Sequence, residues 1–143
     1  MTAQMHPRPG EELDWLAVDK LGRVGLFSTG GQGPVPRALV ELLDTVDAAI
    51  KRLSLLPALG DSTEPTTETG DYSFWIEPAR RGIYGYDWGP LAEGPFARIA
   101  TPSRPILVDD LTDRFVRDVA ELVRLPLDFS DRAYIAASEL GVD

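Results

Sequence analysis

Two short apolar runs near the N-terminus, residues 14–19 and 23–28, constrain the fold more than any other part of the chain. Each run alternates in the manner of a β-strand and carries apolar side chains on both faces. The residues that join them include Asp19 and Gly22, which suit a turn because an aspartate side chain can cap it and a glycine can adopt a positive φ. The pattern therefore predicts a β-hairpin.

An amphipathic helix is predicted after this hairpin. Apolar residues recur at helical spacing from Leu39 to Leu53, charged residues occupy the opposite face, and Pro36 suits a first helical turn. We expect this helix to run for about 18 residues and to end near Pro57.

A second amphipathic helix is predicted from the apolar spacing between residues 111 and 123, with Pro126 at its end. Asp109 and Asp110 precede it, where the helix dipole favours acidic side chains.

Short strands are predicted for residues 72–76, 83–88, 96–100 and 105–108, whereas residues 127–143 fit either a last strand or a short helix. The predicted order of elements is a hairpin, a helix, several strands and a second helix. This order fits an antiparallel sheet better than it fits alternating βαβ units. We expect an α+β fold, in which an antiparallel sheet with an N-terminal hairpin carries two amphipathic helices packed on it.

The chain of 143 residues is expected to form one domain with its own core, over residues 14–143, after a flexible N-terminus of residues 1–13. Residues 57–71 contain four acidic groups, two prolines and no basic group, which predicts a mobile acidic loop. This loop is either a tolerated insertion or a functional element. No apolar stretch is long enough to cross a bilayer and no secretory signal pattern precedes Asp14, so a cytoplasmic location is expected.

Residue types limit the chemistry that can be expected. The chain has no cysteine, which excludes disulfides, thiolate metal sites and cysteine nucleophiles. Its one histidine, His6, lies in the N-terminal stretch predicted to be flexible, so a Ser-His-Asp triad or a histidine-rich zinc site is not expected. We therefore predict no catalytic residues, no metal site and no cofactor.

The glycine-rich stretch before the first predicted helix, residues 29–36, matches neither a P-loop nor a dinucleotide-binding pattern. An anion could bind at the helix start, but Pro34 and Pro36 remove backbone donors there. A turn is the favoured interpretation.

Several aspartate side chains allow an alternative function. Asp19 borders a predicted strand and Asp87 lies among aromatic residues, while Asp109 and Asp110 precede the second helix. Together with Asp14 and Asp113, these side chains could serve a small-ligand or divalent-metal binding protein or a carboxylate-dependent enzyme. Their spacing matches no EF-hand, and helix capping explains the residues at 109–113 as well.

A net charge of −9 and a pI near 4.5 argue against nucleic acid or an anionic membrane as a partner, and favour a basic protein. Aromatic residues are concentrated between 72 and 96 around an arginine pair, and such a cluster is typical either of an interaction surface or of a strand core. The candidate partner-binding residues are Trp75, Arg80, Arg81, Tyr84, Tyr86, Trp88, Asp109 and Asp110.

The segment from Asp14 to Pro36 resembles the opening of a group of small bacterial proteins, D-W-x-A-x-D-x-x-G followed by F-[ST]-[ST]-G-G-x-G-P-V-P. The match covers about a sixth of the chain. This resemblance implies a compact bacterial cytoplasmic protein without an established activity, of a kind that includes immunity-type inhibitors, and it supplies no catalytic residues.

The expected function is thus a non-enzymatic protein-interaction module, immunity-like, that binds a basic partner. The alternatives are the ligand-binding or enzymatic use of carboxylates described above, and a structural or homo-oligomeric role.

Overall fold

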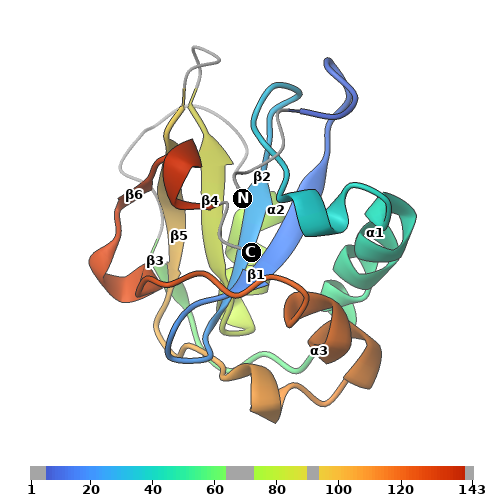
Figure 1. Ribbon diagram of the computed structural model, residues 1–143. Helices are drawn as coiled ribbons and strands as arrows, with labels where there is room; N and C mark the ends of the chain where they lie inside the picture. The colour runs from blue at the N-terminus through green and yellow to red at the C-terminus, as the bar shows by residue number, and fades with distance from the viewer. Residues whose placement is uncertain (1–5, 64–72, 90–93, 141–143) are drawn as a thin grey trace.

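The structure, a computed structural model, describes residues 6–63, 73–89 and 94–140. The fold is α+β, and in these residues it consists of one curled mixed sheet with three α-helices and several short 3₁₀ turns (Figure 1). The strands are β1 (Asp14–Val18), β2 (Val24–Ser28), β3 (Ser62–Thr63), β4 (Tyr84–Trp88), β5 (Phe96–Pro102) and β6 (Tyr134–Ile135). The helices are α1 (Leu43–Lys51), α2 (Ser73–Arg80) and α3 (Arg114–Ala120).

The sheet has the strand order β1-β2-β4-β5, and β3 and β6 both pair with the outer edge of β5. Most neighbouring strands are antiparallel, but β2 and β4 are parallel. The expectation of a purely antiparallel sheet is therefore wrong. Parallel neighbours need a long crossover connection, and the residues between β2 and β4, which include α1 and α2, supply it.

The predicted hairpin is confirmed, with Asp14 opposite Ser28 and Val18 opposite Val24. Its turn is built on Asp19, which is fully buried. One carboxylate oxygen of Asp19 accepts hydrogen bonds from the backbone N–H groups of Leu21 (3.0 Å) and Arg23 (2.9 Å). The strands that this turn joins form the centre of the core.

The first predicted helix is divided into three parts: a 3₁₀ turn at 37–39, α1, and a second 3₁₀ turn at 53–55. Buried residues Leu39, Val46 and Leu53 come from all three parts, so the apolar spacing persists across the breaks. Leu42 precedes α1 without a side-chain cap, and the chain bends there instead of continuing as one helix.

The second predicted helix is shorter than expected. It begins at Arg114 because the side chain of Asp113 caps it, accepting hydrogen bonds from the backbone N–H groups of Phe115 (3.0 Å) and Val116 (3.3 Å). Asp109 and Asp110 lie in a separate 3₁₀ turn before it.

The strand predicted at 72–76 is wrong for its described part, because residues 73–80 form α2. Phe74, Trp75 and Ile76 have high strand propensity, but tertiary contacts decide here. Trp75, Pro78 and Ala79 lie on one side of the helix and face the sheet, at a helical and not an alternating spacing.

The remaining predicted strands are partly confirmed. Strands occur at 84–88 and 96–102, whereas the run at 105–108 contributes only a bridge between Leu107 and Arg23. The segment 127–140 contains both a short strand, β6, and 3₁₀ turns at 129–131 and 137–139.

Two segments predicted to be flexible are described in part. Residues 6–13 lie against the loop after β2, where the N–H of Gly10 donates to the carbonyl of Gly31 (2.8 Å), and His6 is buried. In the predicted acidic loop, residues 62–63 form β3, and residues 64–71 lie outside the described residues.

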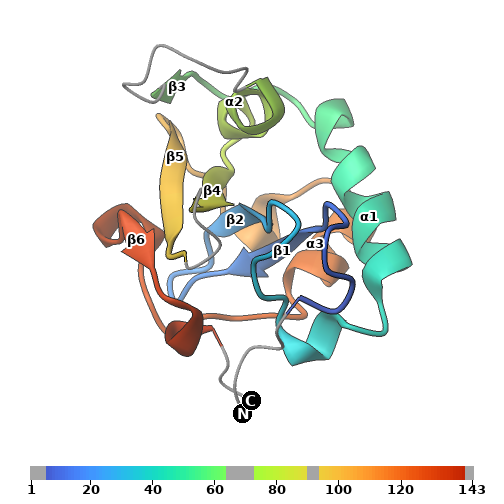
Figure 2. The ribbon, with the colours of Figure 1, turned by 90° about the horizontal axis from the view of Figure 1, so that it is seen from above.

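An aromatic layer on one face of the sheet forms a large part of the core. Trp15 stacks on Phe27 with ring centroids 4.2 Å apart, and Phe27 stacks on Tyr86 at 4.9 Å. Phe129, from the C-terminal segment, covers this layer. Helices α1 and α2 lie on the other side of the sheet (Figure 2).

Candidate functional site

Three of the predicted partner-binding residues belong to the core. Tyr84 and Tyr86 are at most 2% exposed and Trp88 is 8% exposed, so they are unavailable for contact with a partner in the folded chain. The reason is their register, which places them on the same sheet face as Trp15 and Phe27. This corrects their expected place on an interaction surface, and favours the strand-core interpretation of these aromatic residues.

The other predicted residues are spread over several elements. Trp75 is partly buried and donates from Nε1 to the hydroxyl of Ser28 (3.0 Å). Arg81 donates to the carbonyls of Leu56 (2.9 Å), Glu77 (2.9 Å) and Ser54 (3.2 Å), and so ties α2 to the turn after α1. These two side chains have structural roles.

Arg80, Asp109 and Asp110 are exposed. Arg80 pairs with Glu77 one turn earlier in α2, at 3.2 Å. Asp109 and Asp110 form no ion pair with any residue that the structure describes. The structure therefore does not unite the predicted residues in one site.

Asp19, a candidate for ligand or metal binding, has a structural role in the fold. In addition to its turn hydrogen bonds, its second carboxylate oxygen accepts from Arg23 Nε (3.1 Å) and from the buried N–H of Phe129 (3.0 Å). Both oxygens of this buried carboxylate are thus used inside the fold.

Six other carboxylates gather where the N-terminal segment meets the start of α1. They line two adjoining depressions, and Arg8 is the one basic residue among the described residues lining them. All of them except Asp14 are exposed. We call this surface the acidic face; its carboxylates are Glu11, Glu12, Asp14, Glu41, Asp44 and Asp47.

Few of these charges are compensated within the chain. Arg8 pairs with Glu11 at 3.4 Å, and Lys51 pairs with Asp47 at 2.9 Å. Within the described part of the chain, Glu12, Glu41 and Asp44 have no ion-pair partner. Because most of its carboxylates lack an ion-pair partner among the described residues, the face carries a net negative charge.

Asp14 lies at the edge of the acidic face and on the sheet itself. Strand register places Asp14, Ser28 and Asp87 in a row across β1, β2 and β4, on the face opposite the aromatic layer. The Ser28 hydroxyl, which receives the Trp75 N–H, hydrogen-bonds the Asp14 carboxylate. The Oδ1 atom of Asp14 is buried and has no hydrogen-bond partner among the described residues.

Both aspartates of this row, Asp14 and Asp87, have raised pKa values. Burial raises the pKa of Asp14 to about 6, the Ser28 hydroxyl opposes the rise, and the carboxylates of Glu12, Asp47 and Asp87 add to it. Burial likewise raises the pKa of Asp87 to about 6, with Glu12 adding to the rise. These carboxylates therefore influence one another through space, although they come from three distant parts of the sequence.

A cleft of about 370 Å³ adjoins the acidic face. It lies between α1 with its following turn and α2, and we call it the α1–α2 cleft. Its apolar lining residues are Leu26, Ile50, Leu53, Phe74 and Pro78. Its charged lining residues are Asp14, Asp47, Lys51 and Glu77. Asp14 and Asp47 thus belong both to the cleft and to the acidic face.

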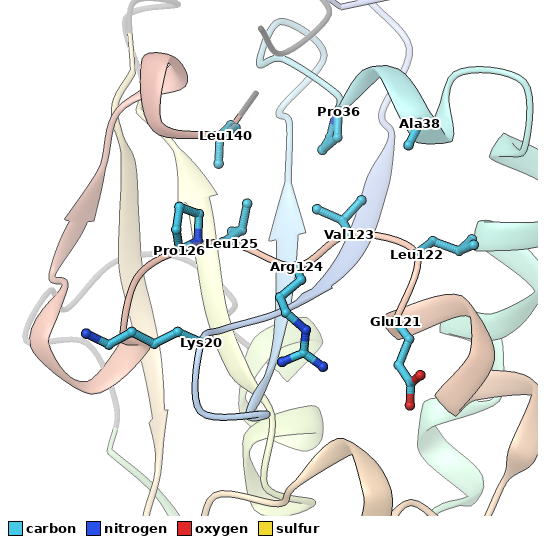
Figure 3. A pocket seen from close by; sticks show the side chains of 10 residues that line it. All are labelled: Lys20, Pro36, Ala38, Glu121, Leu122, Val123, Arg124, Leu125, Pro126 and Leu140. Carbon is cyan, nitrogen blue, oxygen red and sulfur yellow. The ribbon is translucent and has the colours of Figure 1, made fainter. Parts of the chain in front are cut away.

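A larger cavity, of about 630 Å³, lies beside the segment 121–126 (Figure 3). Its centre is apolar, with Pro36, Val123, Leu125 and Leu140, whereas Lys20, Arg124 and Glu121 extend away from this centre. Among the described residues that line it, one is a carboxylate, Glu121, and none is a predicted site residue. Despite its smaller size, the α1–α2 cleft has the more distinctive chemistry, because a carboxylate with a raised pKa lines it.

Among residues 6–63, 73–89 and 94–140, no group of three or more histidine, aspartate or glutamate side chains is arranged to hold a metal ion. Within the same ranges, no helix has the length and apolar character needed to span a membrane.

Comparison of the chain with models of known protein families, with curated proteins and with solved structures finds no match. The geometry of the acidic face and of the α1–α2 cleft is therefore the basis for a functional hypothesis.

Sequence reasoning considered Asp14 but missed its neighbours Glu12, Asp44 and Asp47. Part of the signal was present: the hairpin register fixes Asp14 opposite Ser28, and Asp44 and Asp47 share the polar face of α1. The approach of the N-terminal segment to α1 has no such local signature, because it depends on tertiary contacts.

Proposed function

We propose that this protein is a non-enzymatic interaction module that binds a basic protein partner through its acidic face. The observation that carries the proposal is that, among the described residues, six carboxylates and one arginine converge on a surface built from the N-terminal segment and the 40–47 region. Leu42, at 38% exposed, and Val40 lie in the same surface and add apolar contact area.

Like charges held close together cost free energy in the isolated protein. Burial is the main cause of the raised pKa of Asp14, and the carboxylates of Glu12, Asp47 and Asp87 add to the rise, so part of it reflects this repulsion. A partner that brings lysine or arginine side chains to the face would relieve the repulsion on binding. It would also associate quickly, because complementary potentials steer the encounter.

The resemblance of residues 14–36 to small bacterial proteins indicates which kind of partner to expect. An immunity-type inhibitor acts by covering a functional surface of its partner, and a basic toxin would present the complementary charge to this acidic face. On this proposal the chain needs no catalytic residues of its own.

The test is capture of partners on the purified, tagged protein from the cells that make it, at about 50 mM and about 500 mM salt, with identification by mass spectrometry. We expect a basic protein that is retained at low salt and lost at high salt, because screening weakens exposed charge pairs. Purified again by itself, that protein should bind the chain directly. Repeated captures without such a protein would refute the proposal.

A further inference from the structure

The α1–α2 cleft combines apolar walls with one uncompensated carboxylate. Ile50 and Leu53 come from the α1 side, Phe74 and Pro78 come from α2, and Leu26 belongs to β2. Phe74 is 43% exposed, which is unusual for a large aromatic side chain. The volume, about 370 Å³, lies within the range of small binding sites in proteins.

The charges in the cleft are not equally available. Asp47 is already paired with Lys51 (2.9 Å), and Glu77 is paired with Arg80 (3.2 Å). Asp14 forms no ion pair with a described residue, and its Oδ1 atom is buried without a hydrogen-bond partner in the described part of the chain. A partly buried carboxylate without an ion-pair partner costs free energy when it ionises, and a cation placed beside it compensates this cost.

Neighbouring side chains fix the position of the Asp14 carboxylate. The Ser28 hydroxyl holds its carboxylate and in turn accepts the N–H of Trp75 (3.0 Å). Ser28 is 1% exposed, so this support is part of the core and not a mobile surface contact. A preorganised acceptor of this kind loses little entropy when a ligand binds.

An occupant that suits both features has an alkyl stem and a cationic end. Lysine and arginine side chains have this form, because their methylene groups lie along apolar surface while the charged group reaches a polar partner. We propose that the α1–α2 cleft receives a lysine or arginine side chain of the partner protein, with its charge at Asp14 and its stem along Ile50, Leu53 and Phe74. This inference rests on the proposed function, since it takes the occupant from the same basic partner.

The test uses small cations and needs no partner. ¹H–¹⁵N NMR spectra of the whole chain are recorded during titration with n-butylguanidinium, n-butylammonium and the uncharged n-butanol. We expect both cations to shift the amide signals of residues that line the cleft, Ile50, Lys51 and Phe74 among them, and to bind at least about tenfold more tightly than butanol.

Variants separate charge from apolar contact. Asp14→Asn should weaken binding of both cations about tenfold or more, whereas Asp110→Asn, which removes the same charge from an exposed turn, should not. Phe74→Ala should weaken binding several-fold without a change in charge. Its control is Leu55→Ala, because Leu55 is 79% exposed and does not line the cleft. The wild-type-like amide spectrum of each variant verifies its fold.

The inference would be overturned by an absence of shifts at the cleft, by equal binding of butanol, or by equal binding of the cations to Asp14→Asn. A blocked peptide, acetyl-Gly-Arg-Gly-amide, must bind at the same residues, since binding of the free cations alone would indicate a small-amine site and not a partner contact. Because these titrations contain no partner, their failure is distinct from failure of the capture experiment. The proposed function can stand without this inference.

Discussion

Replacing Asp14 by asparagine should make the protein more stable at neutral pH, which is unusual for a partly buried polar residue. The pKa of Asp14 is about 6 in the fold, against about 3.8 for an ordinary aspartate. The folded chain therefore binds more protons than the unfolded chain between these values, and its stability falls as the pH rises from about 4 to about 6. Above about pH 6 the loss is complete.

The size of the effect follows from the shift. About two pKa units correspond to about 3 kcal/mol at about 1.4 kcal/mol per unit. This is an upper value, because Glu12 and Asp47 are exposed and solvent screens their contribution. Asparagine keeps the size of the side chain and can still accept the Ser28 hydrogen bond, but it cannot ionise. Relative to the wild type, Asp14→Asn should thus gain about 1–3 kcal/mol between pH 4 and pH 7.5.

Urea unfolding at pH 4.0, 5.0, 6.0 and 7.5, followed by fluorescence of the three tryptophans, measures this difference. Asp110→Asn serves as the control and should change the free energy of unfolding by less than about 0.5 kcal/mol at each pH, because its side chain is exposed. A pH-independent difference between Asp14→Asn and the wild type, or a larger advantage at pH 4 than at pH 7.5, would refute the reasoning.

Three further predictions concern the fold and are measured by urea unfolding at pH 7. Asp19→Ala should lower the free energy of unfolding by about 3–5 kcal/mol, because it leaves the partly buried Arg23 guanidinium and the buried N–H of Phe129 without their acceptor. A decrease of less than about 1 kcal/mol would contradict this prediction. Tyr86→Phe should lower the free energy of unfolding by about 1–2 kcal/mol, since the hydroxyl shares its one hydrogen between the backbone carbonyls of Arg132 (2.6 Å) and Phe129 (3.1 Å); an unchanged midpoint would contradict that role. Gly82→Ala should cost at least about 1 kcal/mol more than Gly10→Ala. Both glycines have positive φ, but a Cβ at Gly82 would lie 2.6 Å from a backbone nitrogen whereas one at Gly10 meets nothing within 4 Å, so equal costs would argue against this close approach.

The hairpin could be predicted because its information is local. Alternating apolar residues define β1 and β2, and Asp19 and Gly22 provide the turn between them. The apolar spacing after Pro36 correctly marked the buried positions, but it could not show that the chain bends at Leu42, because each of the three resulting parts buries the same face.

The elements that sequence reasoning missed depend on distant contacts. The aromatic run 73–76 favours a strand by propensity, but Trp75 lies against Gly85 and Ser28 as part of a helix. The parallel pairing of β2 with β4 depends on where α1 and α2 are placed between the two strands, and no residue pattern within either strand encodes it.

The sequence did not locate the candidate site. Net acidity indicated a basic partner, but the residues chosen for contact followed aromatic content, and Tyr84, Tyr86 and Trp88 proved to be core. The acidic face unites residues 11–14 with residues 41–47, and it was missed because like charges that meet through tertiary structure have no spacing rule in sequence.

The most direct test of the acidic face is the salt dependence of affinity for the captured partner, measured by calorimetry for the wild type and two charge-matched variants. One variant, Glu12→Gln/Asp44→Asn/Asp47→Asn, removes three of the six carboxylate charges of the face, and the other, Asp109→Asn/Asp110→Asn/Glu121→Gln, removes three charges elsewhere. We predict that the face variant binds about 100-fold more weakly at low salt and loses most of its salt dependence, whereas the control binds like the wild type. Equal weakening in both variants would show that net charge alone matters, and unchanged binding by the face variant would place the interface elsewhere; either result would contradict the proposed role of this face.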